Sequence, residues 1–71
     1  MEIEELKAKI EAVLFITSRA IEPVEIAQIL GIEDVEIVES ALLELMFDYS
    51  SRNGALEIDD EDGYIIQVKA E

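Results

Sequence analysis

The stretch Ile21–Tyr49, with its helix–glycine–helix pattern, most constrains what this chain can fold into. The segment Pro23–Leu30 has helical apolar spacing, and Pro23 suits a first helical turn, where its missing N–H is not needed. Gly31 is expected to end this helix because glycine adopts the left-handed conformation at little cost. Asp34 can cap a longer helix that runs to about residue 51. The inward stripe of that helix consists of Val35, Val38, Leu42, Leu45 and Tyr49. Two helices joined by so tight a turn predict a helix-turn-helix.

The segment before this unit predicts a first helix over residues 2–18. Its inward stripe consists of Ile3, Leu6, Ile10, Val13 and Leu14, and the second helix adds Ile26, Ile29 and Leu30. Lys7 is expected to lie off the stripe. Residues 12–16 are apolar on every side, which requires cover on more than one side. The core supplies one cover, and either a partner chain or a C-terminal hairpin supplies the other.

Residues 55–70 change to a period of two, which predicts two strands. The residues expected to face the core are Leu56, Ile58, Tyr64, Ile66 and Val68. The loop 59–63 carries an Asp-Gly turn signal, and Asn53 or Gly54 is expected to take a left-handed conformation after the third helix. Ile21 is expected to form a short strand or to fill the core. Residues 1–71 therefore predict one α+β domain, a winged helix with three helices and a two-stranded wing.

The charge of the chain limits its partners. Eighteen acids against five bases give a net charge of −13. DNA binding draws most of its affinity from neutralised phosphates, and the third helix presents acids instead. Arg19, Arg52 and Lys69 are too few and too scattered to compensate. We expect no sequence-specific DNA binding. The acidic surface is explained equally by a basic protein partner or by solubility.

The sequence lacks the residue types that common catalytic and metal sites need. The chain has no histidine and no cysteine, which excludes a Ser-His-Asp triad and a Cys/His zinc site. The acidic loop 59–63 fails the EF-hand pattern, because Ile58 and Lys69 stand where acids are needed. We expect no catalytic, cofactor-binding or metal-binding residues. No apolar run is long enough to span a membrane, and the acidic start is unlike a signal peptide.

Four apolar residues remain after this core is filled: Phe15, Ile16, Leu43 and Phe47. Leu43 and Phe47 are expected roughly opposite the inward stripe of the third helix. Either the hairpin or the first helix covers them, or they form a protein interface. Exposure of all four is unfavourable, because each large apolar side chain gains about 1.5–3 kcal/mol on burial. We predict that they form the twofold contact of a homodimer.

The chain resembles the ScpB family, whose members are accessory subunits of the bacterial SMC–kleisin condensin complex. The family's markers appear here in order as Ala12-Val13-Leu14-Phe15, Ile26-Ala27, Gly54-Ala55-Leu56-Glu57 and Gly63-Tyr64. The family's usual Gly-Glu-Pro-Leu-Ser turn is replaced by Ser18-Arg19-Ala20-Ile21-Glu22. Family members also carry a second winged helix, so we expect residues 1–71 to be the N-terminal domain of a longer, two-domain protein.

The resemblance implies a non-enzymatic interaction and dimerisation domain in chromosome condensation and partition. It implies a cytoplasmic, nucleoid-associated protein that forms a homodimer and whose full-length form meets the kleisin ScpA and the SMC ATPase. In the family the N-terminal domain is associated chiefly with self-association. Two alternatives remain: a winged-helix transcriptional regulator, which a basic surface would favour, and a free-standing protein-interaction module.

Overall fold

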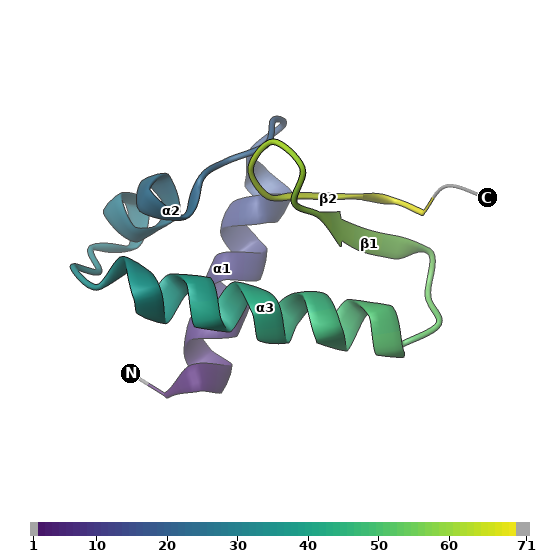
Figure 1. The fold of residues 1–71 in the computed structure, drawn as a ribbon, viewed down its shortest axis with the longest axis horizontal. Helices are drawn as coiled ribbons and strands as arrows, with labels where there is room; N and C mark the ends of the chain where they lie inside the picture. The colour runs from purple at the N-terminus through teal and green to yellow at the C-terminus, as the bar shows by residue number, and fades with distance from the viewer. Residues whose placement is uncertain (1, 70–71) are drawn as a thin grey trace.

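The computed structural model describes residues 2–69 and has the winged-helix order of three helices followed by a hairpin (Figure 1). The elements are α1 Ile3–Ile16, α2 Pro23–Leu30, α3 Val35–Ser51, β1 Leu56–Asp59 and β2 Ile65–Val68. The strands are antiparallel, with Leu56 opposite Val68 and Ile58 opposite Ile66. The α+β winged helix is confirmed. Position 70 of the predicted hairpin segment lies outside the described residues.

The helix-turn-helix is bounded by the residues that the sequence indicates. Helix α2 begins at Pro23, and Gly31 ends it in the left-handed conformation, with φ +71°. The Asp34 carboxylate accepts a hydrogen bond from the Glu36 N–H at 3.0 Å and caps α3. At the start of α2 the Glu25 carboxylate accepts from the Glu22 N–H at 3.2 Å. The Glu25 side chain thus reaches back and satisfies the backbone N–H of Glu22, which is itself a weak capping residue.

Helix α1 is shorter than predicted. It ends at Ile16, and Thr17 is already extended. At the end of α3, Asn53 takes the left-handed conformation, with φ +54°, which is one of the two predicted choices. Ile21 both fills the core and pairs with the chain before β2, because its N–H and carbonyl bond to Tyr64 at 3.0 and 2.8 Å.

The core lies where α1 passes behind α3, with α2 at one end and the hairpin at the other (Figure 1). Its buried apolar residues are Leu6, Ile10, Val13, Leu14, Ile21, Ile26, Ala27, Val38, Ala41, Leu42, Leu45, Tyr49 and Ile58. Leu30, Val35, Leu56, Tyr64 and Ile66 pack against them half-buried. Most of the predicted inward stripes are therefore confirmed.

Three residues assigned to the core are exposed instead: Ile3, Ile29 and Val68. Ile3 is the first residue of α1 and Val68 the last of β2, so both lie at ends of elements, past the packed centre. Ile29 lies about 200° around α2 from the buried Ala27, which puts it on the outer side of that short helix. Ala27 and Ala41 are buried in addition to the predicted inward residues.

Candidate protein interface

Leu43 and Phe47 lie on the outer face of α3, at exposures of 62% and 70%. They are one helical turn apart, so their side chains are neighbours on the surface. Within residues 2–69 neither α1 nor the hairpin covers them, so the alternative in which those elements bury this pair is wrong.

Phe15 and Ile16 form a second exposed pair in the last turn of α1, at 59% and 81%. The buried Val13 and Leu14 precede them, so the core covers only one side of this turn. The hairpin does not supply the second cover within the described residues. An all-apolar helix end left open in this way is a candidate contact surface.

The structure keeps these two pairs apart. Leu43 and Phe47 line an open hollow of about 490 Å³ together with Glu4 and Lys7 from the first half of α1 and with Glu44 and Asp48. Phe15 follows Lys7 by eight residues on α1, which is about 12 Å along the helix axis at 1.5 Å per residue. The four predicted residues therefore form two surfaces, which we call the α1-end pair and the α3 pair.

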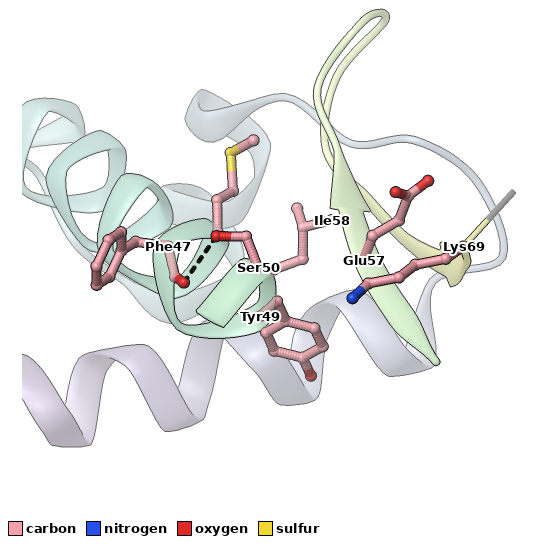
Figure 2. Close-up of a pocket in the computed structure, with 7 residues that line it drawn as sticks. Phe47, Tyr49, Ser50, Glu57, Ile58 and Lys69 are labelled. Carbon is pink, nitrogen blue, oxygen red and sulfur yellow. Dashed lines mark hydrogen bonds between the residues drawn. The ribbon is translucent and has the colours of Figure 1, made fainter. Parts of the chain in front are cut away.

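Phe47 also borders a second hollow, of about 360 Å³, between α3 and the hairpin (Figure 2). Figure 2 shows Phe47 at one end of it and the hairpin residues Glu57 and Lys69 at the other. The hydroxyls of Ser50 and Ser51 both donate to the Phe47 carbonyl, at 2.9 and 2.8 Å. Phe47 therefore lines both hollows, the one beside α1 and the one beside the wing.

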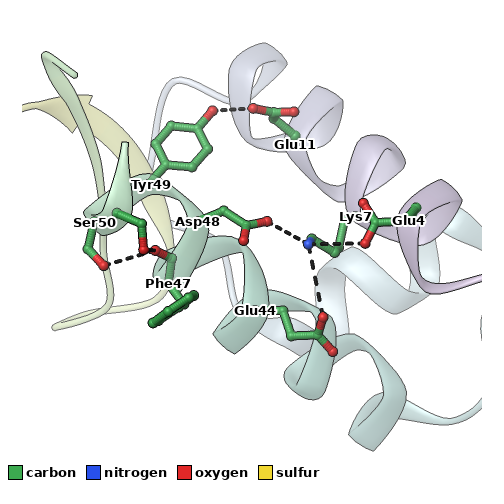
Figure 3. A network of polar contacts seen from close by, with 9 residues as sticks. Glu4, Lys7, Glu11, Glu44, Phe47, Asp48, Tyr49 and Ser50 are labelled. Carbon is green, nitrogen blue, oxygen red and sulfur yellow. Dashed lines mark hydrogen bonds and ion pairs between the residues drawn. The ribbon is translucent and has the colours of Figure 1, made fainter. Parts of the chain in front are cut away.

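A buried lysine joins α1 to α3 beside the α3 pair (Figure 3). The Lys7 ammonium lies 2.5 Å from Asp48, 3.4 Å from Glu4 and 4.0 Å from Glu44, and its side chain is only 10% exposed. Its hydrogen bond to Asp48 and the nearby carboxylates raise the pKa of Lys7, against the opposing effect of burial. The ammonium is therefore charged and fully engaged at neutral pH.

The expectation that Lys7 lies off the inward stripe is wrong. Its spacing gave the signal: Lys7 is four residues after Ile3 and three before Ile10, which places it on the buried side. Charged residues are rarely buried without partners, so the sequence alone favours an exposed lysine at this position. Its partners on α3 become visible only when the two helices are packed.

Tyr49 makes a second polar link between the same helices. Its hydroxyl donates a hydrogen bond to the Glu11 carboxylate (Figure 3). The Arg52 guanidinium lies 4.5 Å from the centre of its ring. Burial first, and then the Glu11 carboxylate, raise the pKa of Tyr49 to about 12. Helices α1 and α3 are thus held by an apolar centre with a polar contact on each side of the crossing.

Residues 8–71 match the family model described as segregation and condensation complex subunit ScpB. The chain belongs to the ScpB family. The crystal structure of ScpB from Mycobacterium tuberculosis matches with a TM-score of 0.89 and 18% sequence identity, which confirms the winged-helix fold. The match covers 99% of this chain and 44% of that one, so the chain spans less than half the length of that protein. No curated protein matches the sequence.

The outward surface of α3 in this ScpB-family domain is acidic. Glu36, Glu39 and Glu44 are exposed along it, and Glu33 and Asp34 are exposed just before its first turn. In a winged helix that binds DNA, this helix enters the major groove and meets phosphates, which carboxylates repel. The surface is therefore unfavourable for contact with DNA phosphates.

Five further large apolar side chains are exposed among the described residues of this ScpB-family domain: Ile3, Val24, Ile29, Ile37 and Val68. They are scattered over the start of α1, α2, the first turn of α3 and β2, and isolated exposed aliphatic residues are ordinary. None of the described helices is long and apolar enough to cross a membrane.

Proposed function

We propose that this ScpB-family domain is a non-enzymatic protein-interaction and dimerisation unit of a chromosome segregation and condensation complex. The family match over residues 8–71 is the observation that carries the proposal. The exposed apolar pairs and the acidic α3 surface support an interaction role over a DNA-reading one.

We propose that the domain is the N-terminal winged helix of a longer protein. In that setting the full-length protein works with the kleisin ScpA and the SMC ATPase, in the cytoplasm and at the nucleoid. The share of the Mycobacterium tuberculosis chain that this one covers, 44%, leaves room for a second domain of similar size.

The proposed homodimer is centred on the α1-end pair, Phe15 and Ile16. The last turn of α1, residues 13–16, carries no charged side chain. The Glu11 carboxylate one turn earlier accepts a hydrogen bond from Tyr49, and the Arg19 guanidinium is paired with Glu25 at 3.0 Å. Two copies can therefore bring these turns together with apolar side chains at the centre of the contact. A twofold contact of this kind repeats each apolar residue and gives the interface an apolar centre.

Light scattering tests the dimer at about 100 µM, where an interface with a Kd near 1 µM is almost fully formed. We expect wild type to be dimeric, Phe15→Glu to be monomeric and Phe47→Glu to remain dimeric, with all three showing the same circular dichroism spectrum. A monomeric wild type overturns the dimer. A dimer that Phe47→Glu breaks and Phe15→Glu leaves intact moves the contact to α3.

The same samples test the alternative of a DNA-binding regulator. We expect no mobility shift with a short duplex at low salt, because the exposed side of α3 carries Glu36, Glu39 and Glu44. A submicromolar shift that salt weakens would contradict the proposal in favour of a transcriptional regulator.

A further inference from the structure

The α3 pair differs from the α1-end pair in its charge surroundings. Its hollow is lined by Glu4, Glu44 and Asp48 around the single ammonium of Lys7. Glu4 and Glu44 keep 77% and 54% of their side chains exposed, so they face solvent as well as the lysine. The apolar floor of the hollow therefore has an acidic rim.

The acidic rim continues along α3 toward its first turn. Glu39 lies four residues before Leu43, and Glu36 lies seven before it, which places both on the same stripe of the helix. Among the described residues, three carboxylates thus line the hollow with one ammonium, which is already paired, and two more continue the acidic stripe along α3. The stripe from Glu36 to Phe47 is about 17 Å long, which is the length of three helical turns.

A second copy of this chain is a poor occupant of the hollow. A twofold contact centred there would oppose identical acidic rims across the interface. The chain offers five bases against eighteen acids, and Lys7 and Arg19 are already paired. Opposing like charges at an interface disfavours association, so the occupant has to bring its own positive charge.

We infer that the hollow between α1 and α3 docks an amphipathic helix of a partner whose apolar stripe is flanked by lysine and arginine. Its apolar residues, spaced at i, i+3 and i+4, cover Leu43 and Phe47, as in other complexes where a helix lies in a groove. Its bases meet Glu36, Glu39 and Glu44. The inference rests on the proposed interaction role of this domain, but it uses a surface separate from the proposed dimer contact.

The probe is an 18-residue peptide of leucine and lysine with leucines at i, i+3, i+4 and i+7. Two matched controls are a peptide with glutamate in place of every lysine, and a scrambled peptide of the same composition without helical periodicity. Binding is followed by fluorescence anisotropy, and the site is mapped by amide chemical shifts of the labelled 71-residue chain. We expect the basic amphipathic peptide to bind, with shifts at Leu43, Phe47 and Glu44, and the controls to bind at least tenfold more weakly.

Two variants separate this site from the dimer contact. We expect Phe47→Ser to weaken binding of the basic peptide by at least tenfold and Phe15→Ser to leave this binding unchanged. Glu44→Lys is expected to weaken it as well and to reduce the salt dependence of binding. Circular dichroism melts confirm that each variant is folded.

Four results overturn the inference, and three of them concern the peptide: equal binding of the scrambled peptide, which means nonspecific charge attraction; shifts that map away from α3; or binding unchanged in Phe47→Ser. Chemical shifts of Leu43 and Phe47 that move with protein concentration in the absence of peptide also overturn it, because they assign the hollow to a second copy. The dimer is measured separately with Phe15→Glu, so failure here is distinguishable from failure of the proposed function.

Discussion

At the scale of single residues, Lys7 links α1 to α3 through its ion pairs with Glu44 and Asp48. Replacing it with methionine keeps much of the packing volume but leaves Glu4, Glu44 and Asp48 facing one another without a counter-ion. We expect Lys7→Met to lower the melting temperature clearly more than Lys9→Met. Lys9 is exposed, and both variants change the net charge equally, so the comparison isolates the ion pairs. Equal losses in the two variants would show that only net charge matters.

Tyr49 makes stability depend on alkaline pH. Burial raises its pKa to about 12, whereas an unfolded tyrosine ionises near pH 10. The folded state therefore holds the proton more tightly. The stabilisation is complete below about pH 10 and is lost as the pH rises toward about 12.

Between about pH 9 and about pH 11.5, we expect the melting temperature of wild type to fall further than that of Tyr49→Phe. The reason is that phenylalanine has no proton to lose. At neutral pH the variant is the less stable of the two by about 1 kcal/mol, from the lost hydrogen bond to Glu11. Thermal melts across this range check both signs, and parallel pH profiles would refute the assignment.

At the scale of elements, the three glycines have different roles. Gly63 in the wing loop has φ +89°, and an added Cβ there would lie 3.0–3.2 Å from Glu22 Oε1 and the Ile21 backbone. Gly31 also has a positive φ, but in open space, and Gly54 has neither constraint. The wing loop therefore packs against the segment that leads into α2.

Alanine substitutions should rank the three glycines by these constraints. We expect Gly31→Ala to cost about 1–2 kcal/mol for the left-handed conformation and Gly63→Ala to cost more, since backbone must also move. Gly54→Ala should be almost neutral. Urea unfolding measures all three, and a Gly63→Ala variant no less stable than Gly54→Ala would contradict the close approach.

The elements that the sequence predicts best are those with explicit end signals. Pro23 and Gly31 bound α2, and the cap Asp34 places the start of α3 at Val35. The end of α1 has no such signal, so its predicted extent reached residue 18 in place of Ile16. Ile29 shows a second limit, because a helix of eight residues has too few turns to separate its inner from its outer apolar side.

Part of the candidate interface can be predicted from the spacing of residues within one helix. Helical spacing alone placed Leu43 and Phe47 opposite the buried stripe, and their exposure follows. The hollow beside them depends on where α1 crosses α3, and spacing within one helix carries no information about that crossing. The partners of Lys7 on α3 and the separation of the two apolar pairs come from the same packing.

At the scale of the whole molecule, the charge distribution separates two kinds of contact. The α1-end pair lies in a turn without charge, and the α3 pair lies among acids. A near-neutral apolar turn suits association with an identical chain, whereas an acidic rim selects a basic partner and steers its approach. The proposed symmetric contact and the inferred asymmetric contact therefore use separate surfaces of one small domain.

The same acidity gives the molecule a dependence of stability on salt. A net charge of −13 on 71 residues repels itself most strongly in the compact state, and most of the carboxylates are exposed. Between about 10 mM and 200 mM NaCl the Debye length falls from roughly 30 Å to under 8 Å, so repulsion across the domain is screened. The ion pairs of the partly shielded Lys7 are screened less. We therefore expect the melting temperature to rise over this range.

A variant with less charge at the tip of the wing provides the control for this rise. Glu61→Gln with Asp62→Asn removes two exposed acids that lie outside the Lys7 cluster and the α3 pair. At about 10 mM NaCl the variant should have a higher melting temperature than wild type. Its melting temperature should also rise less when salt is added, because it has less repulsion to screen. The melts are run on dilute protein so that association does not contribute. A wild-type melting temperature that stays flat or falls between these two salt concentrations would mean that the ion pairs outweigh the net repulsion.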